Sequence, residues 1–199
     1  MNASRQEGIV LQVVKYGEQD LIITVFSAEE GLLKLFLAGG LSRKGKNRLP
    51  MEPLTQAEFV YTSSSSGLLR CRGVSVQSQF RFLRESYALL EAAGQMVDTV
   101  LKSQWASRPA PAMYALFKLY LSHLQEFTDF QVAVSSLRLK ILRHEGVFSL
   151  DKLPPELNEE EGNLVLVLAH GRSLTTLCQM VGIGNFHQKI QRWFLEVMS

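Results

Sequence analysis

The chain has 199 residues, of which 46% are hydrophobic and 20% charged, and its formal net charge at neutral pH is +2. This composition supports a buried core, excludes global disorder, and excludes a strongly basic nucleic-acid binder in which the whole surface is cationic. The only cysteines are Cys71 and Cys178, so a four-thiolate zinc site is excluded and a disulfide framework is not expected. Reduced cysteines, no signal-peptide segment and no apolar run of membrane-spanning length predict a cytoplasmic protein.

Five short apolar, β-branched runs occupy the first part of the chain, and Gly, Ser or acidic turns separate them. We expect strands at 8–15, 20–26, 31–38, 55–61 and 68–76. Five strands of this length suit a small closed barrel, and the five-stranded OB-fold is the natural candidate. Phe36 and Phe59 are expected in the barrel core, whereas Tyr16 lies in a predicted turn and is expected to be exposed.

A basic loop interrupts the strands. Residues 42–48 hold four cations and no acid, with glycines before them and prolines after them. Such a loop can reach a polyanion backbone and release its counterions, although a solvated hairpin loop is the alternative interpretation. Aromatic rings beside cations grip single-stranded nucleic acid, because bases stack on the rings while cations follow the phosphates. The candidate DNA-binding residues are Arg43, Lys44, Lys46, Arg48, Lys34, Tyr16, Arg70 and Arg72.

The hydrophobic period changes from two to about 3.6 near residue 80. Helices are predicted over 81–102, 113–127 and 130–144, with Asp129 as a cap and Gly146 just past the end of the third. Short helices are also expected over 173–181 and 186–197, while the apolar run 164–168 is too short to classify. The chain therefore reads as an α+β protein with an OB-fold domain at 1–79 and an all-helical domain at 80–199.

Catalytic chemistry has no signature in this sequence. The four histidines are scattered, the pair Gly39-Gly40 lacks the ending of a phosphate loop, and the acidic run 159–161 is interpreted as a solvated turn. We therefore predict no enzyme activity, no catalytic residue, no metal and no cofactor.

Several segments together resemble the bacterial recombination mediator family RecO. They are Gly8-Ile9-Val10-Leu11, Tyr16-Gly17-Glu18-Gln19-Asp20-Leu21-Ile22, Ala38-Gly39-Gly40-Leu41-Ser42-Arg43-Lys44 and Met51-Glu52-Pro53-Leu54-Thr55. The resemblance implies an N-terminal OB-fold with a helical C-terminal domain. It also implies binding of single- and double-stranded DNA in DNA repair and recombination, strand annealing, association with the nucleoid, and RecA loading together with RecR.

The chain departs from the family pattern at three places. Gly39 replaces a family lysine, the region 147–162 lacks the cysteines that form a zinc site in many members, and Ser135-Ser136 stands where the family often has arginines. The resemblance implies that the helical domain binds the acidic, apolar-ended tail of single-strand-binding protein. A groove between the second and third helices is the expected site, with the partner-binding candidates Lys118, Leu121, Arg138, Lys140, Leu142 and Arg143.

Three other interpretations stay open from the sequence. The barrel could be an RNA-binding OB module, the chain could be a protein-interaction scaffold, or the helical domain could only buttress the barrel. Discrimination between RNA and DNA separates the first of these from a DNA mediator.

Overall fold

The computed structural model describes residues 3–41, 51–63, 69–181 and 184–198. The chain forms two compact units, one made of 1–80 with 104–115 and the other of 81–103 with 116–199. We call them the barrel unit and the helical unit. The α+β class with an N-terminal barrel and helices after it is confirmed. The division of the chain differs from the predicted boundary in one respect, because the segment 104–115 returns to the barrel unit.

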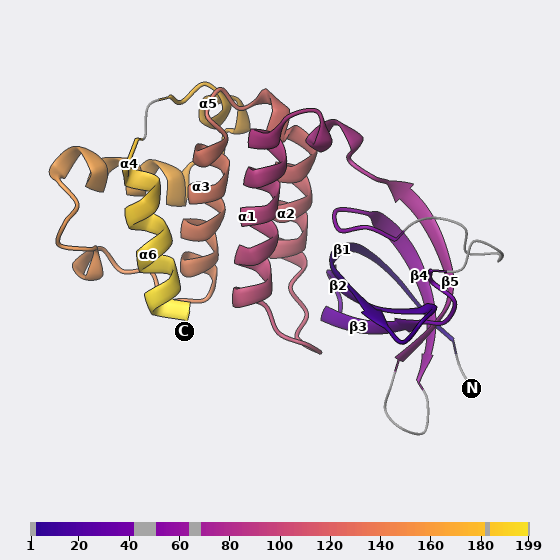
Figure 1. Ribbon diagram of the computed structural model, residues 1–199. Coiled ribbons are helices and arrows are strands. Elements are labelled where there is room, and N and C mark those ends of the chain that lie inside the picture. Colours follow the sequence, from indigo (N-terminus) through magenta and orange to yellow (C-terminus); the bar gives the residue numbers. More distant parts are fainter. Residues whose placement is uncertain (1–2, 42–50, 64–68, 182–183, 199) are drawn as a thin grey trace. The chain divides into compact units, whose positions relative to one another are not determined.

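The barrel has five strands: β1 (Ser4–Tyr16), β2 (Asp20–Ser27), β3 (Gly31–Leu37), β4 (Gln56–Ser63) and β5 (Leu69–Ser78). They close into a barrel in the order β1-β2-β3-β5-β4. Figure 1 labels the five strands. Neighbouring strands are antiparallel except β3 and β5, which pair in parallel through Leu35–Leu69 and Phe36–Arg70. The order and the single parallel closure match the expected OB-type barrel.

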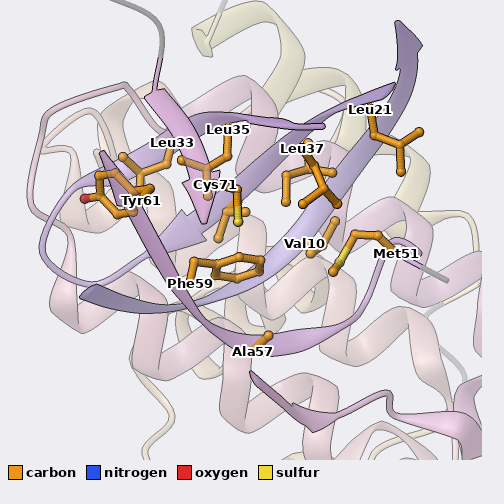
Figure 2. Packing of buried hydrophobic residues seen from close by; sticks show 12 residues of the cluster. Val10, Leu21, Leu33, Leu35, Leu37, Met51, Ala57, Phe59, Tyr61 and Cys71 are labelled. Atoms are coloured by element: carbon orange, nitrogen blue, oxygen red, sulfur yellow. The ribbon is translucent and has the colours of Figure 1, made fainter. Parts of the chain in front are cut away.

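Alternate residues of each strand point into the barrel and form its core, because side chains in a strand alternate between the two faces. Figure 2 shows this core, whose fully buried members include Val10, Leu35 and Phe59. On β3 the leucines at 33, 35 and 37 face inward, so Phe36 faces outward and is only partly buried. The expectation for Phe59 is confirmed, and the expectation that Phe36 belongs to the core is wrong.

The helical unit contains α1 (Tyr87–Ser103), α3 (Phe130–His144), α4 (Glu159–His170), α5 (Leu174–Cys178) and α6 (Phe186–Met198), and α2 (Pro111–His123) joins it at residue 116. The first predicted helix starts later than expected. Residues Arg81–Arg84 form a 3₁₀ turn, and the Ser86 hydroxyl then accepts a hydrogen bond from the Leu89 amide at the start of α1.

Helix α3 lies between α1 and α6 (Figure 1) and is buried over most of its length. Asp129 caps it as predicted, accepting a hydrogen bond from the Gln131 amide, and Gly146 follows its end with a φ of 73°. Because neighbouring helices cover α3 on several sides, nearly all its side chains from 132 to 142 are buried, polar ones included.

Helix α4 combines two segments that the sequence analysis treated separately. The acidic run 159–161 is its first turn rather than a loop, and the apolar run 164–168 is its continuation. The Asn158 side chain accepts a hydrogen bond from the Glu161 amide, and the Glu161 carboxylate accepts one from the Asn158 amide. This reciprocal capping box starts the helix, and the acids in its first turn suit the positive end of the helix dipole.

Candidate nucleic-acid interface

One row of outward-facing residues crosses the barrel near the β1–β2 turn. Val14 pairs with Ile22, Ile22 with Phe36, and Phe36 with Arg70. Directly paired residues of adjacent strands point to the same face of a sheet. The register therefore places an aromatic ring beside a guanidinium on the outer surface.

Tyr16, Phe36 and Arg70 form a cluster that we call the aromatic platform. The Tyr16 and Phe36 rings meet edge to face, with centroids 5.8 Å apart and planes at 87°. The Arg70 guanidinium carbon lies 5.7 Å from the centroid of the Phe36 ring, within the range of a cation–π contact. Tyr16 is 57% exposed, so the platform presents an aromatic surface to solvent beside a fixed positive charge.

Two further predicted cations lie on the same outer surface of the barrel. Lys34 precedes Phe36 by two residues, shares its face of β3 and is exposed. Arg72 on β5 is also exposed, and its Nε donates a hydrogen bond of 3.1 Å to the Thr62 hydroxyl. The structure thus brings Tyr16 and Arg70 into one cluster around Phe36 and places Lys34 and Arg72 on the strands that carry it.

The basic loop is anchored at both of its described ends. The Gly39 amide donates a 2.7 Å hydrogen bond to the Asp20 carboxylate, and the Leu41 amide donates one of 2.9 Å to the Gln19 carbonyl. On the other side, Met51 is buried in the barrel core. The predicted binding residues Arg43, Lys44, Lys46 and Arg48 lie outside the described residues. Tyr16 is the last residue of β1 rather than part of a turn, and the turn that follows it holds Leu41 through Gln19.

A second feature with binding chemistry is a pocket of about 50 Å³ within the helical unit. Four leucines and Tyr120 supply its apolar lining, and Lys140 and Arg172 supply its cations. The lining residues are Leu116, Leu119, Tyr120, Lys140, Gly171, Arg172, Leu174 and Leu177. The Lys140 ammonium donates to the Gly171 carbonyl after the end of α4. Burial, and then the neighbouring Arg143, lower the pKa of Lys140.

The six predicted partner-binding residues fall into different environments. Leu121 and Leu142 are fully buried, so their side chains are part of the core rather than of a surface slot. Arg143 is exposed and its Nη1 donates to the Ala169 carbonyl at 3.4 Å, whereas Lys118 on α2 is partly buried. Of the six, only Lys140 lines the pocket.

Arg138 lies in the interior of the helical unit and is 3% exposed. Its Nε lies 3.3 Å from the Thr99 hydroxyl, and its Nη1 has no hydrogen-bond partner among the described residues. Burial lowers the pKa of Arg138 to about 10, and Asp98 partly opposes that effect. This burial keeps Arg138 from direct contact with a ligand on the surface.

Within the described ranges, no three His, Cys, Asp or Glu side chains gather into a possible metal site. The part of the chain that the structure describes also contains no helix long and apolar enough to cross a membrane.

Comparison with known proteins identifies relatives of this chain. Residues 1–80 match the family model described as Recombination protein O N terminal. The DNA repair protein RecO of Chlamydia trachomatis serovar L2 is 30% identical over 145 residues, which is 73% of this chain and 59% of that protein. The RecO proteins of Exiguobacterium sibiricum and Bacillus pumilus are each 29% identical, over 72% and 78% of this chain and 57% and 58% of their own lengths.

The chain belongs to the RecO family. The matches span less than two thirds of the relatives' own lengths.

Gly39, just before the basic loop, is one of the three places where the sequence differs from the pattern expected of the RecO family. Gly39, where the resemblance implies a lysine, has a φ of 65°, a left-handed conformation that glycine adopts without strain. Its amide donates a hydrogen bond to the Asp20 carboxylate. Gly39 therefore forms a tight turn that is bonded to Asp20 at the start of β2.

Two groups of residues were not found from the sequence. Phe36 could have been assigned to the outside, because Leu33, Leu35 and Leu37 set the inward phase of β3 and leave Lys34 and Phe36 on the other face. Arg172 and the leucines of the pocket carry no comparable signal, since the pocket forms only when α2, α3 and α5 come together.

Proposed function

We propose that this RecO-family chain is a DNA-binding protein of DNA repair that uses the outer face of its barrel to hold single-stranded DNA. One observation carries the proposal. Tyr16, Phe36 and Arg70 form an aromatic platform, and Gly39 and Leu41, just before the segment with four cations, are bonded to Asp20 and Gln19 next to it. In OB-folds the strand 2–3 face and neighbouring loops bind oligonucleotides. Phe36, which contacts both other members of the platform, lies on β3.

The chemistry of the platform suits unpaired bases. A base can stack on Tyr16 or Phe36, while Lys34, Arg70 and the cations of the basic loop neutralise phosphates. Neither interaction reads a base edge, so we expect binding with little sequence preference and with strong salt dependence.

The experiment is a titration of fluorescent oligo(dT) with the protein at a series of salt concentrations. The test variant combines Lys34→Glu with Arg70→Glu, and the matched control combines Lys102→Glu with Arg192→Glu on the helical unit. The control changes the net charge by the same amount and breaks only surface ion pairs, which contribute little.

We expect the test variant to weaken binding at least about tenfold in low salt, and the plot of log affinity against log salt to lose about 0.7 in slope for each phosphate contact removed. Reversing Arg43, Lys44, Lys46 and Arg48 to Glu should weaken binding by orders of magnitude. Equal affinities of wild type, test variant and control would contradict the proposal. Tighter binding of oligo(rU) than of oligo(dT) would instead favour an RNA-binding module.

The finer role that we propose is that of a recombination mediator in the nucleoid. It binds single- and double-stranded DNA, anneals complementary strands and assists RecA loading with RecR, without catalysing a reaction of its own. Support comes from the relatives, which are named DNA repair protein RecO. An annealing assay with complementary oligonucleotides tests it, and loss of annealing in the Lys34→Glu, Arg70→Glu variant is the expected result.

We also propose that the pocket of the helical unit binds the acidic, apolar-ended tail of single-strand-binding protein. The leucines suit a terminal apolar side chain, and Lys140 with Arg172 suits its carboxylates. Burying a terminal Phe stabilises a complex by roughly 1.5–3 kcal/mol. Charge-assisted hydrogen bonds add about as much, and association entropy offsets part of both. We therefore expect micromolar affinity.

Titration of an acidic peptide ending in Phe against the full chain tests this site. Arg172→Glu should weaken binding by about tenfold or more, because it removes a cation that lines the pocket. Lys118→Glu is the matched single reversal outside the lining and should change the affinity less than about twofold. If Lys118→Glu weakens the complex and Arg172→Glu does not, the tail binds elsewhere on α2.

A further inference from the structure

The connection between α1 and α2 is part of the barrel unit and crosses the first residues of β3. We call residues 104–115 the strap. The Leu32 amide donates a 3.0 Å hydrogen bond to the Trp105 carbonyl, and the Ala110 amide donates one of 2.8 Å to the Ala28 carbonyl. Ala106 forms isolated bridges with Gly31 and Leu32. These backbone contacts fix the position of the strap on the barrel.

The strap approaches β3 so closely that only glycine fits beneath it. Gly31 has a φ of 64°, and a Cβ atom there would lie 2.3 Å from the Trp105 carbonyl oxygen and 2.4 Å from that of Arg108. Both distances are far below van der Waals contact. The main chain of Trp105 is therefore held tightly against the start of β3.

The side chain of Trp105 is nevertheless exposed. Its exposed fraction is 60%, whereas Trp193 on α6, the other tryptophan of the chain, is 5% exposed. A tryptophan of the barrel unit with a fixed backbone and a solvent-exposed ring is a ready stacking surface, because it loses little freedom when a flat ligand binds.

The strap brings the backbone of Trp105 to the start of β3, the strand that carries Phe36 of the platform. The outward residues of β3 are Leu32, Lys34 and Phe36, and Leu32 is bonded to Trp105. At about 3.3 Å per residue, the four steps from Phe36 to Leu32 span roughly 13 Å. That is about four spacings of 3.4 Å in a stacked strand, or about five nucleotides.

We propose that Trp105 is a second base-stacking site, and that a single strand of nucleic acid follows β3 from the aromatic platform over Lys34 to Trp105. This inference rests on the proposed function, since it extends the same binding face. It gives the strap a role in binding as well as in covering the start of β3. It also sets a minimum length of about five nucleotides for a ligand that contacts both ends.

The test uses the full chain with Trp193→Phe, so that Trp105 is the only indole. Oligo(dT) of 12 nucleotides is added at low salt while tryptophan fluorescence and iodide quenching are recorded. The anisotropy of the same oligonucleotide carrying a dye reports binding independently. The matched control is the chain with Trp105→Phe, in which the buried Trp193 should not respond to DNA.

We expect saturating DNA to quench Trp105 and to protect it from iodide. Trp105→Ala should weaken binding by about 5- to 100-fold, as expected for the loss of one stacked base, and Trp105→Phe should retain most of the affinity. Saturating anisotropy with unchanged Trp105 fluorescence and iodide accessibility would overturn the second stacking site while leaving the proposed function in place. Absence of any anisotropy change at low salt would overturn both.

Discussion

Gly31 shows how a single residue supports the binding face. Its positive φ ends the β2–β3 turn, and its missing Cβ leaves room for two carbonyl oxygens of the strap. Gly17 in the β1–β2 turn has nearly the same φ, 65°, but a Cβ there would meet nothing within 4 Å. A substitution at Gly17 therefore introduces backbone strain alone, whereas one at Gly31 introduces the same strain together with a steric overlap.

We predict that Gly31→Ala destabilises the barrel unit far more than Gly17→Ala does. Gly17→Ala should cost about 1–2 kcal/mol, which is the cost of the left-handed conformation for a residue with a side chain. Gly31→Ala adds an overlap with the backbone and should cost about 3 kcal/mol or more in total. Urea unfolding followed by circular dichroism measures both. Equal losses would mean that the strap moves away without a penalty.

At the level of elements, the start of α4 is held by a small polar network. Glu161 takes part in the capping box with Asn158, and its carboxylate oxygens each accept a 2.7 Å hydrogen bond from Lys189 of α6. These contacts lower the pKa of Glu161, the bond from Lys189 contributing most and the Asn158 amide next. The network therefore links α4 to α6 through one ionised carboxylate.

The sign of the pH dependence follows from this lowered pKa. The unfolded chain takes up the proton first as the pH falls, so the contribution of Glu161 is fully present above the ordinary pKa of a glutamate and is lost as the pH falls through its lower folded value. We predict that Glu161→Gln lowers the melting temperature of the helical unit at pH 7. The variant should also lose less stability than the wild type when the pH falls from 7 to 3. Glu160→Gln removes the same charge from the same turn and serves as the control. Parallel pH curves for the two variants would show that the link to Lys189 contributes nothing.

The elements that the sequence predicted well are those with a strong local pattern. The strand at 31–38 and the cap at Asp129 are readable without tertiary contacts, and both are confirmed, although the face of β3 that carries Phe36 was assigned wrongly. The candidate site was predictable only in part. Tyr16 and Arg70 were named, but the contact of Arg70 with Phe36 depends on the β3–β5 register, which joins residues 34 positions apart. The contact of Tyr16 with Phe36 depends on the pairing of β1 with β2 and of β2 with β3. The pocket and the burial of Arg138 depend on helix packing, which no local period encodes.

For the whole molecule, the important fact is that the barrel unit is discontinuous in sequence. Tyr114 of the strap packs edge to face on Phe26, with ring centroids 5.7 Å apart, and its hydroxyl donates a 2.8 Å hydrogen bond to the Glu7 carboxylate. Burial, and then Glu7, raise the pKa of Tyr114, so the phenol remains a donor at neutral pH. The strap therefore adds both apolar burial and a charge-assisted hydrogen bond to the barrel.

We predict that a fragment of residues 1–80 is less stable than the barrel of the full chain. The loss should be about 3 kcal/mol or more, from the buried Tyr114 ring and its bond to Glu7. A synthetic peptide of residues 104–115 added in trans should raise the melting temperature of the fragment, whereas the same peptide with Tyr114→Ala should not. A fragment that melts like the full barrel and ignores the peptide would show that the strap is not needed for stability.

The strap also has a consequence for the order in which the protein is made. When the ribosome has added residue 80, all five strands have been synthesised. It must add a further 35 residues, from 81 to 115, before the barrel unit is complete. At about 5–20 residues per second, this delay is roughly 2–7 s. During that interval the nascent barrel lacks the cover for Phe26 and for the start of β3, so the timing of translation becomes part of how this protein reaches its fold.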